Sequence, residues 1–271
     1  MVKVQDFRSR FGFHATPFTR EIAVKDRFPI QDCDDAIEAV LRTLDARMSC
    51  ALIAPAGTGK TSVLRAVIAS LPEARYRTHY VKVTGLSKRD MCREIGQAIG
   101  LAPVGTYPSL VRKLQDRFLQ TTDTDGLRPV LILDEAHDLR VETLSMMRLL
   151  TNFDMDSRLV LSIVLAGQPK LRDLLRRDEL EDVARRLSHY ATLRTLSRGE
   201  VERYVEHRCT IAGAVKVPFD QAAIDALFEI GRGNLRATDE LARKALEVVH
   251  DQDHDVCGAG HIAHARKLLS P

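Results

Sequence analysis

The stretch APAGTGKT at residues 54–61 constrains the fold more than any other part of the chain. It follows an apolar, strand-like run at residues 50–54 and leads into a helical pattern at residues 60–71. Gly57 and Gly59 allow the backbone to wind so tightly that successive N–H groups point into one concavity at a helix N-terminus, where an anion is held. The pattern therefore predicts a phosphate-binding loop between a strand and a helix.

This loop predicts a site for ATP with Mg²⁺. We expect Lys60 to reach the β and γ phosphates and the Thr61 hydroxyl to complete the Mg²⁺ shell. The strict pattern has glycine where this chain has Ala54, but both phosphate-facing glycines, the lysine and the threonine are in place. The expected nucleotide-binding residues are Ala54, Pro55, Ala56, Gly57, Thr58, Gly59, Lys60, Thr61 and Ser62, together with Asp134 and Arg236 from later in the chain.

A second apolar run, VLIL, ends in the carboxylates Asp134 and Glu135. Ligands of open α/β sheets bind at the carboxyl ends of the strands, so Asp134 can reach the Mg²⁺ water shell beside the loop. Glu135, one residue on, can polarise the attacking water. A lysine, a magnesium ion and a carboxylate base suffice for phosphoryl transfer to water, which predicts hydrolysis of ATP to ADP and phosphate.

Short apolar runs alternate with amphipathic stretches from residue 50 onward, which is typical of a parallel sheet with crossover helices. We expect strands at residues 50–54, 79–83, 130–133, 159–165 and 191–193. The helical patterns lie at residues 60–71, 87–99, 107–120, 140–152 and 169–187. The predicted fold class is α/β, a three-layer core with a central parallel five-stranded sheet.

After residue 195 the apolar positions recur at helical spacing only. Helices are expected at residues 198–212, 219–230, 235–249 and 259–269, which makes a small all-α domain. The predicted divisions are residues 1–48, an N-terminal segment with the first helix of the core, residues 49–196, the α/β core, and residues 197–271, the helical domain.

The composition of the chain indicates the cellular compartment in which it works and the kinds of surface that it can have. The net charge of the 271 residues is only +3, so any basic surface must be local. The five cysteines are odd in number and scattered, which argues against a disulfide framework and favours a reducing compartment. The longest apolar runs are of strand length, far below a membrane span. We therefore expect a cytoplasmic protein with no membrane association.

Four further polar residues are candidates for catalysis. Gln168 follows the fourth apolar strand and could bind the γ-phosphate or the water, or could cap the next helix. Arg185 and Arg186 precede the last strand and could stabilise transition-state charge in a neighbouring subunit. Arg236 lies in the first turn of a helix that would face the nucleotide. Surface ion pairing is the alternative for each arginine.

With these residues in place, the chain resembles the AAA+ superfamily of ATPases. APAGTGKT looks like the Walker A motif and VLILDE like Walker B, while Gln168 stands at the sensor 1 position. ARRL at residues 184–187 resembles the arginine-finger region, and GNLR at residues 233–236 resembles sensor 2. The resemblance implies that the helical domain is a lid and that adenine is walled by the segment around Phe18 and Ile30 and by the lid near Arg236.

More narrowly, FGFHATPF at residues 11–18, DEAH at 134–137 and LAGQPKL at 165–171 resemble the ExeA-like ATPases, a group similar to the transposition helper ATPases of the Mu B, TniB and TnsC kind. Secretion ATPases of this group carry a membrane span and a peptidoglycan-binding domain after the ATPase, and the sequence reaches Pro271 without either. The resemblance thus implies an ATP-dependent regulator of DNA transposition. An ExeA-type secretion or assembly ATPase and a nucleotide-gated signalling switch are the alternatives.

For such a regulator, the resemblance implies that ATP-bound subunits form a ring or helical filament on duplex DNA and recruit or activate a transposase, and that hydrolysis disassembles them. Lys88 and Arg89 fall at an expected helix start, where a side chain and free N–H groups can meet one phosphate. Thr106 could add a neutral phosphate contact. A plain solvated helix face is the alternative for these residues.

Overall fold

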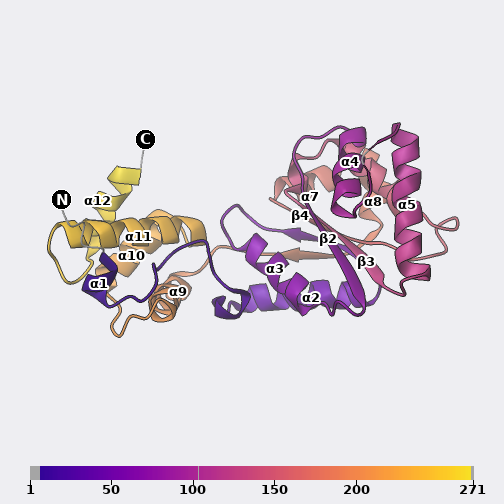
Figure 1. The fold of residues 1–271 in the computed structure, drawn as a ribbon. Helices are drawn as coiled ribbons and strands as arrows, with labels where there is room; N and C mark the ends of the chain where they lie inside the picture. Colours follow the sequence, from indigo (N-terminus) through magenta and orange to yellow (C-terminus); the bar gives the residue numbers. More distant parts are fainter. Residues whose placement is uncertain (1–6, 103, 270–271) are drawn as a thin grey trace. The chain divides into compact units, whose positions relative to one another are not determined.

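The computed structural model describes residues 7–102 and 104–269 (Figure 1). They form two compact units, each described by itself below. One unit, Gln31–Leu193, contains the sheet, and the other joins the described residues up to Ile30 to those from Arg194 onward. We call them the sheet unit and the helical unit.

The sheet unit is built on five parallel strands in the order β2-β3-β4-β1-β5. The carboxyl ends of all five strands therefore lie along the same edge of the sheet. Strand β1 lies between β4 and β5, and only β4 separates it from β3. The strands are β1 (Ser49–Ile53), β2 (Tyr76–Lys82), β3 (Arg128–Asp134), β4 (Ser162–Gly167) and β5 (Leu187–Thr192).

Helices cover both faces of this sheet, which gives the expected three-layer α/β fold. On one face, α2 packs against β1, β5 and α3. On the other face, α4 packs on β2 and α5 packs on β3, and α6 contacts both helices. The helices of the unit are α2 (Gln31–Asp45), α3 (Lys60–Ser70), α4 (Lys88–Ala98), α5 (Tyr107–Asp123), α6 (Val141–Thr151), α7 (Lys170–Leu175) and α8 (Glu181–Ala184), with short 3-10 turns η2 (Ala136–Asp138) and η3 (Asp178–Leu180).

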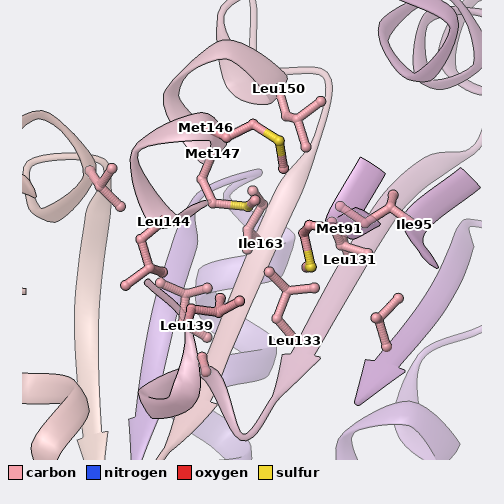
Figure 2. Packing of buried hydrophobic residues seen from close by; sticks show 14 of the residues in the cluster. Met91, Ile95, Leu131, Leu133, Leu139, Leu144, Met146, Met147, Leu150 and Ile163 are labelled. Carbon is pink, nitrogen blue, oxygen red and sulfur yellow. The ribbon is translucent and has the colours of Figure 1, made fainter. Parts of the chain in front are cut away.

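The buried core on the α4–α6 face holds the strands in place. Figure 2 shows side chains of α4, α6, β3 and β4 converging on one apolar cluster. Leu131 and Leu133 of β3 are fully buried in it, and truncation of such a residue to alanine costs about 2–5 kcal/mol. Tight packing on β3 and β4 fixes where their carboxyl ends lie, and therefore where the polar residues that follow them are placed.

The five predicted strands and their parallel direction are confirmed, but some of the predicted ends are wrong. β2 begins at Tyr76, three residues earlier than expected, because its ladder with β3 already pairs Tyr76 with Arg128. The helix expected over residues 169–187 is wrong in its continuity and in its end, although η3 and α8 are helical within its second half. It breaks after α7, where Arg177 adopts an extended backbone, and Leu187 already pairs with Ser49 in the ladder of β5 with β1.

The helical unit confirms the four helices expected after residue 195. Three of them begin at capping residues that satisfy the free N–H groups of the first turn: Ser197 with Glu200 in a capping box, Asp220, and Asn234. The helices of the unit are α1 (Phe7–Phe11), α9 (Arg198–Ile211), α10 (Gln221–Gly231), α11 (Leu235–Asp251) and α12 (Ala259–Leu269), with the 3-10 turn η1 (Val24–Asp26).

The described residues up to Ile30 pack with these helices. Arg10 donates to Asp253 at 2.5 Å and to Asp255 at 3.0 Å, and the buried Arg208 of α9 donates to the Thr19 carbonyl at 2.7 Å. We expected residues 1–48 to form one segment that includes the first core helix. The structure instead groups the described residues up to Ile30 with the helical unit. The division after the sheet falls at Arg194, three residues before the expected one.

All five cysteines are buried, and none of them forms a disulfide within the described residues. Burial raises the pKa of the Cys50 and Cys92 thiols, each to about 12, so both are neutral at physiological pH. Within the described part of the chain, no helix combines the length and the apolar character that crossing a bilayer requires.

Candidate nucleotide site

The loop between β1 and α3 has the backbone that the glycine pattern predicts. Gly57 has a φ of 76° and Gly59 a φ of 94°, a region that glycine enters without steric cost. Gly59 is the N-cap of α3 and offers no side chain to the N–H groups of the first turn, which leaves them facing the loop. Ala54 is fully buried and its backbone is not left-handed, so alanine fits where the strict pattern has glycine.

Lys60 binds the two carboxylates that follow β3. Its Nζ donates to Asp134 Oδ1 and, at 2.8 Å, to Glu135 Oε1. Lys60 is 7% exposed and Asp134 is 2% exposed, so the ammonium and the first carboxylate depend on each other in a site shielded from water. The sequence motifs at residues 54–61 and 130–135 are thus brought together at the carboxyl edge of the sheet.

These residues fit a nucleotide with a divalent cation. Two carboxylates face one ammonium, which leaves a negative charge that Mg²⁺ would neutralise. Mg²⁺ prefers one or two carboxylates together with phosphates and water in its shell, and Asp134 and Glu135 offer the carboxylates. Thr61, the second residue of α3, is exposed next to Lys60, and its hydroxyl can complete such a shell.

Tyr80 also contacts this site, although no sequence pattern singled it out. The hydroxyl of this β2 residue donates to Asp134 Oδ2 at 2.9 Å. Burial and the neighbouring Asp134 carboxylate raise the pKa of Tyr80, so the hydroxyl keeps its proton and acts as a donor. In the strand pattern Tyr80 is an ordinary aromatic residue, and only the β2–β3 register, which pairs Lys82 with Asp134, brings it beside the carboxylate.

Glu135 is held in an uncommon conformation. It has a φ of 60° and a ψ of 32°, the left-handed region that a residue with a side chain rarely adopts. Its backbone N–H donates to Asp134 Oδ1 at 2.8 Å, and its carboxylate oxygen Oε2 lies 3.5 Å from Nδ1 of the buried His137. The turn from β3 into η2 therefore directs the Glu135 carboxylate to the same side as Lys60.

Gln168 follows β4 as predicted and connects to His137. The backbone N–H of Gln168 donates to His137 Nδ1 at 3.3 Å. A Cβ on Gly167 would lie 3.1 Å from the His137 backbone nitrogen, so glycine permits the close approach of β4 to η2. The Gln168 side chain makes no hydrogen bond to the described residues and is free to reach a ligand. The DEAH spelling at 134–137 was the only sequence signal for His137.

The two arginines before β5 are held differently. Arg186 is 26% exposed and both of its terminal nitrogens contact the Asp156 carboxylate. Arg185 is 73% exposed and, among the described residues, pairs only with Glu181, at 2.5 Å and one helical turn away. An exposed i,i+4 pair contributes little free energy, so Arg185 can leave its partner more readily than Arg186 can.

Arg236 lies in the helical unit. It is exposed in the first turn of α11, whose N-cap Asn234 accepts from the Ala237 N–H at 3.1 Å. A Cβ on Gly233 would overlap the Leu196 carbonyl oxygen at 1.9 Å, so only glycine allows the turn before α11. Phe18, expected near adenine, is buried in the same unit, edge-to-face on Phe219. The adenine-binding role of these residues stays a prediction.

The expected DNA contacts lie at one exposed corner of the sheet unit. Arg89 in the first turn of α4 donates to the Gly105 carbonyl at 3.1 Å, which places it beside Thr106. Thr106 is the exposed N-cap of α5 and caps no N–H with its hydroxyl. Lys88 is half-buried at the start of α4. The structure thus brings the three residues together.

Comparison with known proteins agrees with this geometry. Residues 42–175 match the family described as "AAA domain". This part of the chain is an AAA domain. Because the chain also has the P-loop AAA+ fold, we identify this part as an ATPase domain. The fold implies that the domain binds a nucleotide.

A curated relative is General secretion pathway protein A of Aeromonas hydrophila, which is 32% identical over 192 residues. The match covers 70% of this chain but only 35% of the relative, so the chain spans about a third of that protein.

Several solved structures share the fold of this chain at low sequence identity. The Aeropyrum pernix ORC1 protein in complex with DNA is 17% identical with a TM-score of 0.69, over 95% of this chain and 70% of that one. Cdc6p from Pyrobaculum aerophilum is 16% identical with a TM-score of 0.73, over 93% and 70%. The Thermotoga maritima RuvB Holliday junction branch migration motor is 17% identical with a TM-score of 0.60, over 93% and 73%.

Proposed function

We propose that this protein is an ATP-dependent regulator of DNA transposition. ATP-bound subunits assemble as a ring or filament on duplex DNA, recruit or activate a transposase, and leave the DNA after hydrolysis. The observation that carries the DNA part is the joining of Lys88, Arg89 and Thr106 at one exposed corner. The proposal that the partner is a transposase rests on the sequence resemblance alone.

In this proposal the buried cluster binds ATP and hydrolyses it. Lys60 would leave its two carboxylate partners for the β and γ phosphates, and Thr61 and Asp134 would hold Mg²⁺, which would supply charge neutralisation for those phosphates. Glu135 orients and deprotonates the attacking water, and the free amide of Gln168 contacts the γ-phosphate or that water. A Glu135→Gln protein that turned over ATP at the wild-type rate would remove Glu135 from this role.

We assign the trans-acting arginine to Arg185 because it is more exposed and more loosely held than Arg186. In an assembled ring or filament it would stabilise transition-state charge in the neighbouring subunit. The turnover per subunit of the wild type then rises with protein concentration. Arg185→Ala removes this rise and Arg186→Ala, the matched control, keeps it; the reverse pattern moves the assignment to Arg186.

The DNA-binding corner recognises phosphates and not bases. Two cations, a threonine hydroxyl and the first-turn N–H groups of α5 are phosphate ligands, and none of them reads a sequence by itself. Binding should therefore be tolerant of sequence and weaken steeply with salt. The small net charge of +3 is compatible with this, because an assembly repeats a local patch along the duplex. The similar ORC1 protein, whose structure was solved in complex with DNA, adds support from the fold.

Electron microscopy of negatively stained protein tests the proposal. The purified chain is imaged with a non-hydrolysable ATP analogue, with duplex DNA, with both and with neither. Rings or filaments that require both support the proposal, and particles indifferent to DNA contradict it.

A secretion or assembly ATPase is the second candidate. It is favoured by the 32% identity to General secretion pathway protein A. An ATPase of this kind would bind a membrane-protein partner in a nucleotide-dependent way and would not be stimulated by DNA. ATP turnover measured with and without duplex DNA separates the two candidates.

A further inference from the structure

A second cavity in the sheet unit lies away from the phosphate-binding loop. It has a volume of about 530 Å³ and lies among α7, η3, α8 and the edge strand β5. Its volume falls in the range of small-molecule sites in proteins, about 300–1,000 Å³. None of the residues assigned above to ATP, Mg²⁺ or DNA lines it.

Three arginines line this cavity. Arg172 and Arg176 lie one turn apart at the end of α7, and Arg177 follows directly. Like charges at this spacing repel each other, so an unliganded cluster of this kind lowers the stability of the helix end. The cluster is thus a place where an anion would be favourable.

None of these three arginines forms an ion pair within the described residues. The Arg172 side chain donates to the neutral Thr192 hydroxyl at 2.7 Å, which fixes it across the end of β5, and the side chains of Arg176 and Arg177 make no ion pair. Of the two acidic residues in the lining, Glu181 pairs outward with Arg185 at 2.5 Å. Asp178 alone remains against three guanidinium groups.

The helix dipole gives a simpler reason for one of the arginines, but not for all three. A cation near a helix C-terminus is favourable, which accounts for Arg176 at the end of α7. It does not account for Arg177, which has left the helix with an extended backbone. Nor does it explain why the three guanidinium groups surround a cavity that also contains an aromatic ring.

That ring belongs to Tyr190 of β5, which is 39% exposed. Its hydroxyl donates to the Ala184 carbonyl at 3.4 Å, so the ring is held between β5 and α8. Leu175, only 3% exposed, adds an apolar wall to the same cavity. An exposed aromatic face beside guanidinium groups is the combination that binds a nucleobase together with its phosphate.

We propose that this cavity binds a nucleotide unit, with its phosphate on Arg176 and Arg177 and its base on Tyr190. Arg172, anchored by Thr192, is the third cation. Planar guanidinium groups bind phosphate oxygens in pairs, which a lysine cannot do with the same geometry. The nucleotide unit comes either from a free nucleotide or from a single strand of nucleic acid, since both present the same groups. This site is independent of the function proposed above.

The test measures ligand binding to the full-length Lys60→Ala protein, whose phosphate-binding loop no longer competes for nucleotides, after circular dichroism has verified its fold. The probes are thymidine monophosphate, inorganic pyrophosphate and a short labelled oligodeoxythymidine. Adding Arg176→Ala and Arg177→Ala should weaken the binding of all three about tenfold or more. The matched control adds Arg203→Ala and Arg243→Ala, two exposed arginines of the helical unit, and should change the affinity less than twofold.

Two further variants test the assigned contacts. Replacing both Arg176 and Arg177 by lysine keeps the charge but should still weaken pyrophosphate binding severalfold. Tyr190→Leu should weaken thymidine monophosphate and leave pyrophosphate unchanged. A stronger affinity for the oligonucleotide than for the monophosphate identifies a strand as the source, and equal affinities identify a free nucleotide. Unchanged binding in the double alanine variant, or equal binding of polyglutamate, would overturn the proposal.

Discussion

The cluster of Lys60, Asp134 and Glu135 is largely buried, whereas the corner formed by the starts of α4 and α5 is exposed, and the two regions fix their polar residues in different ways. In the cluster, Lys60 and Asp134 are almost completely buried and contact each other directly, so the fold determines where each charge lies. At the corner, Arg89 and Thr106 are exposed, and Arg89 donates to the Gly105 carbonyl at 3.1 Å. A buried site is specified by packing, whereas an exposed one is specified by charge and by the partner that it meets.

The largest effect is expected from Lys60→Ala. The change removes the cation for the phosphates and leaves two carboxylates without their partner, so kcat/KM for ATP should fall by roughly a thousandfold, near the upper end for loss of one charged group. Measured ATP turnover and binding check this, with the exposed Lys267→Ala as the control. Turnover close to that of the wild type would mean that the cluster is not the ATP site.

Glu135→Gln should separate hydrolysis from binding. The amide keeps the shape of the side chain but cannot accept the proton of the water, so kcat should fall about a hundredfold or more while ATP still binds. Single-turnover kinetics and equilibrium binding measure the two quantities. Loss of ATP binding together with kcat would instead make Glu135 a binding residue.

Charge reversal tests the exposed corner. In a protein with Lys88→Glu and Arg89→Glu, duplex DNA affinity should fall about tenfold or more. The slope of log affinity against log salt should become shallower by roughly 0.9 for each phosphate that the protein no longer neutralises. Arg112→Glu and Arg117→Glu are the matched control, because they change the same charge on α5 beyond its first turn. Equal weakening of DNA binding in both proteins would show that only net charge matters.

Tyr80→Phe should have the smallest effect. It removes one 2.9 Å hydrogen bond to Asp134 Oδ2 and leaves the ring in place. A single hydrogen bond to a charged group contributes about 1.5–3 kcal/mol, and because Tyr80 is 44% exposed, water can replace part of it. We therefore expect a three- to tenfold rise in the Mg²⁺ concentration needed for half-maximal turnover. An unchanged magnesium dependence would make Tyr80 a packing residue only.

The sequence motifs predict the buried site well because their spacing is local. Gly57, Gly59 and Lys60 belong to one loop and helix start, and Asp134 and Glu135 end one apolar strand. The sheet then brings the two motifs together, which the rule on strand carboxyl ends anticipates. The five strands follow from the same local patterns.

Contacts that depend on strand register could not be predicted in this way. Tyr80 meets Asp134 only because β2 pairs in register with β3, and His137 meets Gln168 only because Gly167 allows η2 to approach β4. The sequence pattern does not predict the break after α7, because the apolar residues on both sides of the break keep a helical spacing. The grouping of residues up to Ile30 with the helical unit depends on distant ion pairs such as Arg10 with Asp253.

The nucleotide dependence of duplex DNA binding tests most directly whether the buried cluster controls the exposed corner. Fluorescence anisotropy of a labelled duplex is measured with a non-hydrolysable ATP analogue, with ADP and without nucleotide, for the wild type and for Lys60→Ala. We predict tight, salt-sensitive binding only for the wild type with the ATP analogue. DNA binding of equal strength in all conditions, or in both proteins, would contradict the link between the nucleotide site and DNA.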